Sequence, residues 1–320
     1  MAQKFVLRSA EEVRKTVTND MQKRIRRMYE ELYDDISKEV AKLSNIDYQK
    51  QNLILIQKQI KTRMLQLNND IKNGIVSDMY KISNEVVYDM RSFLKQCGFK
   101  DNEVHNAFQR VPVDVVESIV SGSVYQKDWS LSGAIWGYNK KVQDALTKII
   151  SIGTQKGKSS VDIAKDLESY VKPGARKGAR TITSWRYDNF GNKIVDKVYF
   201  GNVDYNALRL ARTMVSHSYE QSIINTNKNN PFVEGYKWIT SNFHGRVCEI
   251  CEERAETDQY GLGVGVFPKD ELPLDHPNGM CTFEVVLVDD MEGIADRIAG
   301  WYNSPLGTYK DIDKYAEEFI

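Results

Sequence analysis

The chain has 320 residues, of which 44 are Lys or Arg and 44 are Asp or Glu, so its formal net charge at pH 7 is zero. This length supports one large or two ordinary domains with a hydrophobic core, and the balanced charge gives no overall field that favours nucleic acid or an anionic membrane. No apolar run approaches the length of a membrane span, and residues 1–15 lack the apolar core of a signal peptide. We therefore expect a protein of cytosol-like conditions with no membrane partner.

The first hundred residues carry a helical period. A capping box at residues 9–12 precedes apolar residues that recur at threes and fours from 13 to 43. A second apolar stripe predicts a helix over 47–96, which would be roughly 75 Å long at about 1.5 Å per residue, with Gly74 as the expected position of a bend. Two helices joined by a short turn should pack antiparallel. Their apolar stripe exceeds what a thin hairpin buries, so it packs on the rest of the chain or docks into a larger assembly.

The middle of the chain alternates helical and extended patterns. Pro112 suits the first turn of a helix, and further helices are predicted after Trp129 and from Ser160. From Thr181 the period changes to two, which predicts a β-hairpin around a turn at 188–192. The later elements are a helix over 206–225, strands over 232–241 and 282–288, and helical segments over 291–320 interrupted at 303–307.

A Gly-rich segment between the helix from Ser160 and the hairpin carries four basic residues and no acidic ones. Lys172, Arg176, Lys177 and Arg180 are candidate nucleic-acid-binding residues, because a flexible backbone with Arg side chains can approach phosphate closely. Four charges in a neutral protein equally fit a solvated loop. Both interpretations stay open at this point.

Residues 244–281 contain three of the four cysteines and two of the four histidines. Cys248 and Cys251 form a C-x-x-C pair, and His276 and Cys281 follow in an H-x4-C spacing. The two cysteines of the C-x-x-C pair and the His and Cys of the H-x4-C pair can together form a tetrahedron of ligands around zinc. Because the protein would fill all four positions, such a site should hold structure and not activate water.

Other interpretations of the cysteine-rich segment remain. The 24 residues between Cys251 and His276 exceed what a compact zinc finger needs. A disulfide among these cysteines, or thiols buried as small apolar groups, would also explain them, although clustered cysteines suit a reducing compartment. His244 is an alternate ligand or a solvated turn histidine.

The pair Asp275-His276 between cysteines resembles the ββα-metal (HNH) nucleases, in which an Asp-His pair starts the catalytic hairpin. After Cys281 the chain has no second C-x-x-C pair and no further histidine. The second zinc half and the later metal-binding histidine of those nucleases therefore have no counterpart. A metal-dependent nuclease is kept as an alternative function.

A second resemblance covers roughly residues 129–287. The segments 131–136, 157–160, 211–213 and 235–241, followed by C-x-x-C and a terminal His-Pro-Asn-x-x-Cys, are similar to the phage head morphogenesis domain, also called the phage Mu F-like or minor head protein family. Members commonly read His-Pro-Asn-Cys-Arg-Cys, whereas this chain has Gly and Met before its last cysteine. Many members also have a glutamate where this chain has Met214.

The resemblance implies a minor head protein of a tailed phage that acts in head assembly, with DNA packaging or ejection as a further expected role. It would be present in few copies inside the procapsid near the portal, and in the host cytoplasm during assembly. Its expected partners are the portal protein, with major capsid or scaffold protein and packaged DNA as further candidates. We expect a non-enzymatic chain. The alternatives are the HNH-like nuclease and an internal DNA-binding virion protein.

The expected fold class is α+β. A long N-terminal antiparallel helical hairpin should precede a mixed helical and small antiparallel-sheet domain with a Cys/His knuckle. The expected divisions are a helical arm over 1–110, a head-morphogenesis-like domain over 111–290 and a helical tail over 291–320. The expected metal is a structural zinc held by Cys248, Cys251, His276 and Cys281.

Overall fold

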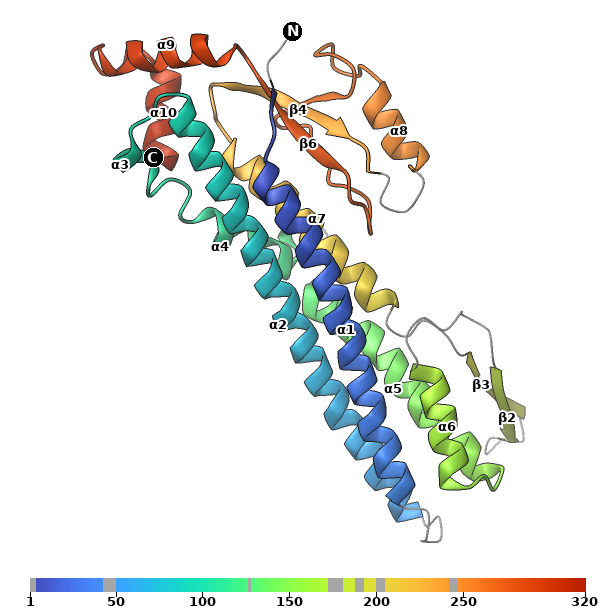
Figure 1. Ribbon diagram of the computed structural model, residues 1–320. Helices are drawn as coiled ribbons and strands as arrows, with labels where there is room; N and C mark the ends of the chain where they lie inside the picture. The colour runs from blue at the N-terminus through green and yellow to red at the C-terminus, as the bar shows by residue number, and fades with distance from the viewer. Residues whose placement is uncertain are drawn as a thin grey trace. The chain divides into compact units, whose positions relative to one another are not determined.

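The computed structural model describes residues 4–42, 50–125, 128–171, 181–187, 193–199, 205–241 and 247–320. It is mostly helical, at 68%, with a small four-stranded antiparallel sheet, which confirms the α+β class. Every helix in the described ranges is too short or too polar to cross a lipid bilayer. The elements of Figure 1, in chain order, are β1 (Lys4–Phe5), α1 (Arg8–Lys42), α2 (Lys50–Gln96), α3 (Asp101–Val104), α4 (Val111–Ser121), η1 (Ser123–Tyr125), α5 (Leu131–Gln155), α6 (Ser160–Val171), β2 (Thr181–Tyr187), β3 (Lys193–Tyr199), α7 (Tyr205–Thr226), β4 (Val233–Ile239), α8 (Glu249–Glu256), β5 (Val266–Pro268), β6 (Thr282–Leu287), α9 (Met291–Tyr302) and α10 (Lys310–Phe319).

The chain forms two compact units, each assembled from separate stretches of sequence. Unit 1 contains residues 1–18, 76–126 and 212–320, and unit 2 contains residues 19–75 and 127–211. Three long helices contribute residues to both units. The compact units therefore do not follow the boundaries at 110 and 290 that we expected from the sequence.

In unit 1, the start of α1 is capped by a carboxylate from α2. The backbone N–H of Ala10 donates to Oδ2 of Asp89 at 2.9 Å, which satisfies one of the free amides of the first turn. Burial raises the pKa of Asp89, and hydrogen bonds from Ala10 and Ser9 oppose that rise. The helix begins at Arg8, so Ser9 lies inside the first turn and not before it as the capping box predicted.

In unit 2, the remaining parts of α1 and α2 pack antiparallel. Ile36 and Ile60 are buried, and the guanidinium of Arg63 lies 3.3 Å from the carboxylate of Asp35. Together with the contact between Ala10 and Asp89 in unit 1, this pairing confirms the predicted antiparallel helices. α2 continues through Gly74 as a single element.

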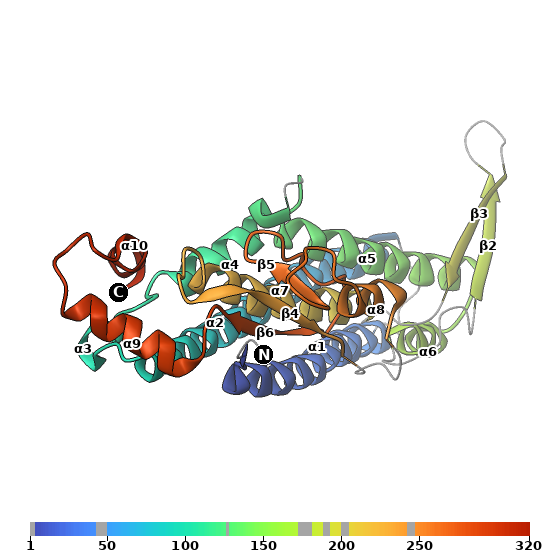
Figure 2. The same ribbon diagram turned by 90° about the horizontal axis from the view of Figure 1, so that it is seen from above.

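A polar network is buried between three helices of unit 2. The hydroxyl of Tyr29 donates to Oδ1 of Asn139 on α5 at 2.6 Å, and the amide nitrogen of Asn139 donates to Asn68 on α2. The tight packing of α5 on α6 requires Gly153, because a Cβ there would overlap Ile163. The two predicted strands of the hairpin are confirmed as the antiparallel pair β2 and β3, which contact α5 (Figure 2). The predicted turn at 188–192 lies outside the described residues.

The sheet of unit 1 has the strand order β1-β6-β4-β5, and all its pairs are antiparallel. The central pair aligns Trp238 with Phe283, both buried. The pairing of β4 with β6 has a bulge between Val233 and Gly235. On its other edge, β4 lies so close to β5 that a Cβ at Gly235 would overlap the carbonyl of Phe267. β4 and β6 confirm the predicted strands; β1 and β5 were not predicted.

Within unit 1, α7 packs against the second half of α2. The hydroxyl of Ser218 donates to the carbonyl of Met79 at 3.0 Å, and the hydroxyl of Ser222 donates to that of Ser83 at 2.8 Å. Small hydroxyl side chains allow the two helix backbones to come close. The side of α7 that faces away from α2 contacts the loop that precedes β6.

Candidate metal centre

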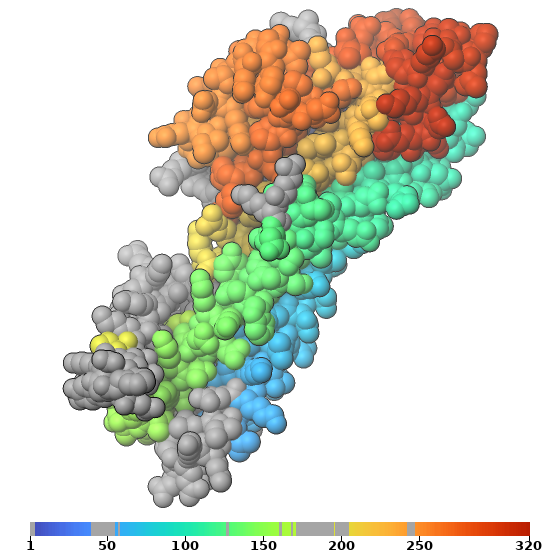
Figure 3. Space-filling view, turned by 180° about the vertical axis from the view of Figure 1, so that it is seen from behind, coloured from blue at the N-terminus to red at the C-terminus, as the bar shows by residue number. Residues whose placement is uncertain are grey.

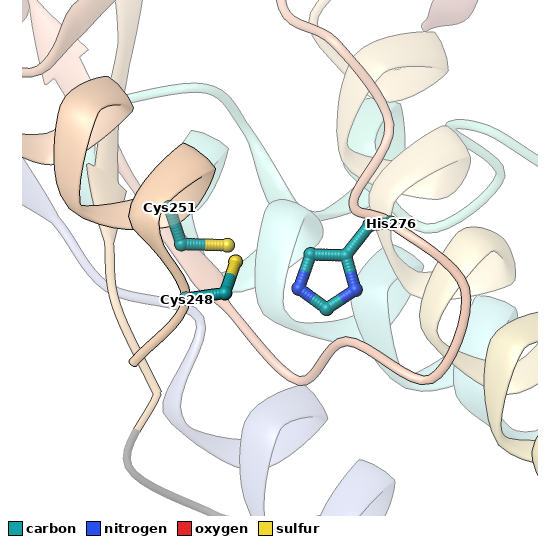
Figure 4. A group of neighbouring side chains, drawn as sticks. All are labelled: Cys248, Cys251 and His276. Carbon is teal, nitrogen blue, oxygen red and sulfur yellow. The ribbon is translucent and has the colours of Figure 1, made fainter. Parts of the chain in front are cut away.

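The C-x-x-C pair lies at the start of α8. Cys248 is the residue before the helix and Cys251 belongs to its first turn. Residues three apart share a helix face, and the sulfur atoms of the two side chains lie next to each other, on the side where the ring of His276 is found (Figure 4). His276 and Cys281 belong to the loop that leads into β6.

Two overlapping groups of metal-ligating atoms meet at Cys251. The Sγ atoms of Cys248 and Cys251 and a ring nitrogen of His276 all lie within 4.8 Å of one another. Cys251 also forms a second such group with Cys281 and a carboxylate oxygen of Asp275. Three predicted ligands are thus brought together directly, and this cluster could hold a metal ion. Cys281, the fourth predicted ligand, is grouped with Cys251 and Asp275 but not with Cys248 and His276, so the predicted set of four is brought together only in part.

The carboxylate of Asp275 organises the loop that carries both later ligands. Its Oδ1 accepts from the backbone N–H of His276 at 2.8 Å, and its Oδ2 accepts from that of Cys281 at 2.9 Å. The side chain is buried inside the loop. A Cβ at Gly279 would overlap this carboxylate, and Asn278 turns the backbone with a φ of 74°. We call residues 275–281 the ligand loop.

Side chains of α7 hold the ligand loop from one side. Oε2 of Glu220 accepts from the N–H of Asp275 at 3.0 Å. Nε2 of His217 lies 3.0 Å from the carbonyl of Asp275, and since a carbonyl only accepts, Nε2 carries the proton. Nδ1 of His217 then accepts from the hydroxyl of Tyr125 at 2.8 Å. Burial lowers the pKa of His217, in agreement with this neutral imidazole.

Three more residues of α7 contact the turn of the ligand loop. The guanidinium of Arg212 donates to Oδ1 of Asn278 at 2.6 Å, and the N–H of Asn278 donates to the hydroxyl of Thr213 at 2.9 Å. One turn later, the hydroxyl of Ser216 donates to the carbonyl of Gly279 at 3.0 Å. The two sequence segments Arg212-Thr213 and His276-Pro277-Asn278 therefore meet in space.

Arg14 of α1 holds the other end of the ligand loop. Its two terminal nitrogens donate to the carbonyls of Cys281 and Met280, at 2.8 and 3.2 Å. The guanidinium also lies over the ring of Tyr219, 4.4 Å from its centroid, a cation–π geometry. This buried arginine fixes the backbone of the last ligand from a residue 267 positions earlier in the chain.

Burial and neighbouring groups favour the neutral form of the Cys251 and Cys281 thiols. Burial raises the pKa of the Cys251 thiol well above its usual value, and a hydrogen bond with Cys248 and the neighbouring Cys281 act in the same direction. Burial also raises the pKa of Cys281, and the charge of Asp275 adds to it. A bound cation would reverse these shifts by stabilising thiolate. Thiols with an imidazole fit a borderline or soft transition metal.

The remaining candidate residues are not part of the cluster. Lys172, Arg176, Lys177, Arg180 and His244 lie outside the described residues. All four cysteines are free thiols, so the disulfide alternative is not seen. The fourth, Cys97, is buried at the end of α2, and burial raises its pKa to about 12.

Sequence reasoning missed the groups that position the ligands. In the sequence, Asp275 was considered only as part of the Asp-His pair. The signal that could have identified it is an acidic residue four positions before a glycine, which is the pattern that this tight loop needs. Arg14 and Glu220 gave no local signal, because each lies on a helix whose apolar period explains its neighbours. Their roles depend on contacts across 267 and 55 residues.

The chain was compared with protein-family models, curated proteins and solved structures. No protein-family model, curated protein or solved structure matches the chain. The function must therefore be argued from the residues of this chain and from the contacts they make.

Proposed function

We propose that this chain is a minor head protein of a tailed phage, a structural component that associates with the portal inside the head and acts in head assembly. In this proposal the cluster at Cys251 holds a structural zinc ion. Major capsid or scaffold protein is a further partner during assembly in the host cytoplasm. The chain is then part of the virion and performs no reaction.

The observation that carries the proposal is the contact between Arg212-Thr213 on α7 and the His-Pro-Asn turn of the ligand loop. Both segments contribute to the resemblance to head morphogenesis proteins. Arg212 and Asn278, which share a hydrogen bond, are 66 positions apart in the sequence. A chance match of two short motifs would give no reason for them to touch. Their contact favours a shared structural module over two unrelated sequence coincidences.

The chemistry of the donors supports zinc. Thiolate and imidazole are the usual ligands of structural zinc, and Cys248, Cys251, His276 and Cys281 would supply four of them. Both oxygens of Asp275 accept backbone N–H groups, so in this proposal the carboxylate holds the loop, and the three thiols and the imidazole are the ligands. Bound zinc would contribute on the order of 10 kcal/mol to folding at neutral pH.

A closed zinc site explains how the module could serve assembly. The ion would tie the start of α8 to the loop that leads into β6, and so fix two segments that the sheet alone does not join. With all positions filled by protein, no site remains for an activated water. The rigid loop and α8 would then present a constant surface to a partner.

The proposal is tested in heads assembled from the phage's own proteins. Purified heads should contain this chain in few copies, detected by mass spectrometry, and heads assembled without the portal protein should lack it. The control is the major capsid protein, which should be present in both preparations. Heads that contain portal but none of this chain would contradict the proposal.

The nuclease alternative has a separate test. It requires cutting of plasmid DNA that Mg²⁺ or Mn²⁺ stimulates and that His276→Ala abolishes. The proposed zinc site predicts no cutting by either protein and a lower thermal stability of the variant. Metal-stimulated cutting that disappears in His276→Ala would replace the structural role.

A further inference from the structure

The neutral chain is divided into two units of opposite charge. Unit 2 contains 26 Lys and Arg against 16 Asp and Glu, a net charge of +10, whereas unit 1 contains 18 against 28, a net charge of −10. The expectation that charge favours no nucleic-acid partner holds for the whole chain, but not for unit 2. The folding of distant segments into one unit creates this excess, since residues 19–75 and 127–211 each contribute to it.

One part of the excess is a lysine stripe on α2. Lys58, Lys61 and Lys72 fall within about 60° of one another around the helix axis at roughly 100° per residue, and span about 21 Å along it. Lys58 and Lys61 are exposed and Lys72 is half-buried. None of the three has an ion-pair partner among the described residues. The stripe therefore has charge available for another molecule.

A second lysine stripe lies on α5. Lys140, Lys141 and Lys148 are exposed on the side opposite the buried residues Ile135 and Leu146, with the exposed Asp144 among them. They too have no ion-pair partner within the described part of the chain. On the face of unit 2 seen in Figure 3, α5 in green lies beside the first half of α2 in blue. The hydrogen bond between Asn139 and Asn68 joins the same two helices.

We propose that unit 2 binds the phosphate backbone of duplex DNA through the lysine stripes of α2 and α5. Duplex DNA carries one negative charge per about 1.7 Å of its axis, so a row of cations about 21 Å long matches an extended polyanion better than a small ligand. The choice of duplex DNA among nucleic acids rests on the proposed role in a phage head. The binding itself does not depend on that role.

The side-chain chemistry favours DNA over an acidic protein. All six positions are lysine, which is depleted in protein–protein interfaces and contacts phosphate as a point charge. The acidic unit 1 would be repelled by the same DNA, so contact should be confined to unit 2. Binding of this kind is independent of base sequence.

The experiment measures the affinity of the full-length chain for a duplex of about 30 base pairs by fluorescence anisotropy between about 50 and 200 mM salt. The test variants are Lys58→Glu with Lys61→Glu, and Lys141→Glu with Lys148→Glu. The matched control is Lys228→Glu with Lys310→Glu in unit 1, two exposed lysines whose change alters the total charge equally. Circular dichroism checks folding, and the corresponding Lys→Gln pairs serve if a Glu pair does not fold.

We expect the wild-type affinity to fall steeply with salt. Each test pair should lower the slope of log affinity against log salt by about two, at roughly 0.9 for each phosphate that a lysine no longer neutralises, while the control keeps the wild-type slope. The absence of salt-dependent binding, an equal loss of affinity in the control, or equal affinity for polyglutamate would each overturn the proposal. Because purified protein is used, failure of the chain to enter heads would leave this result unchanged.

Discussion

The ligand loop of unit 1 and the helix pair of unit 2 are stabilised by different kinds of contact. The helices of unit 2 bury apolar stripes, with one polar network at Asn139 between them. The ligand loop instead surrounds a carboxylate and receives hydrogen bonds from α1 and α7. A buried polar group without its partner keeps its full desolvation cost. Removal of a hydrogen-bonding side-chain group should therefore cost more in the ligand loop than in unit 2.

Among substitutions that leave the proposed zinc ligands in place, the largest effect is expected for Asp275→Ala. It removes the acceptor of two backbone N–H groups, the part-buried one of His276 and the buried one of Cys281, and hydrogen bonds to a charged group contribute about 1.5–3 kcal/mol each. We expect stability to fall by about 3–5 kcal/mol, measured by urea unfolding. The exposed Asp270→Ala is the control and should change stability little. A decrease in Asp275→Ala no greater than in the control would show that the carboxylate does not organise the loop.

The same substitution at two glycines should have opposite effects. Gly279→Ala forces a Cβ into the space of the Asp275 carboxylate and should cost about 1–3 kcal/mol, as overpacking does. Gly74→Ala meets no atom within 4 Å in the middle of α2 and should stabilise by about 0.5–1 kcal/mol, because alanine loses less backbone entropy in a helix. Thermal unfolding of both variants measures the difference. Equal shifts would contradict the close packing assigned to the loop.

A smaller cost is expected for Tyr29→Phe in unit 2. The change leaves Oδ1 of Asn139 without the 2.6 Å hydrogen bond from the tyrosine hydroxyl, which should cost about 1–2 kcal/mol. Tyr138→Phe, at a half-buried position on the same helix as Asn139, is the control. If Tyr29→Phe destabilised more than Asp275→Ala, the contrast between the two regions would be reversed.

The order in which thiols react with a maleimide should separate the cysteines without changing stability. Cys97 is fully buried and its pKa is raised to about 12, so its thiolate is scarce at neutral pH. Cys248 is partly exposed and should react first once a chelator is present. Mass spectrometry of labelled peptides gives the order. Reaction of Cys97 before Cys248 would contradict the burial of the end of α2.

The sequence predicted most helices and the central strands because their apolar periods are local. The stripe that includes Ile60 and Ile75 identifies α2, and alternation identifies the hairpin from Thr181. The start of α1 was less predictable, since its first-turn amide is capped by Asp89, 79 residues away. β1 and β5 have two and three residues, too short for a period to be seen.

The ligands themselves could be predicted, but not the residues that hold them. Residue type and the C-x-x-C spacing selected Cys248, Cys251, His276 and Cys281, because cysteine and histidine are the usual ligands of structural zinc, and the structure groups the first three of them. Arg14 donates to backbone carbonyls and Glu220 accepts from a backbone N–H. Every residue has such backbone groups, so the sequence does not show which of them a distant side chain will reach. The division of charge between the units was hidden for the same reason, since each unit combines segments far apart in the chain.

Metal analysis of the purified full-length chain tests the central claim most directly. We expect one zinc per chain by plasma mass spectrometry, its loss in Cys248→Ser, and a lower melting temperature of the wild type in chelator. Asp270→Ala should retain the metal. A wild-type chain that contains no zinc, does not take it up, and melts at the same temperature with and without chelator would contradict the account.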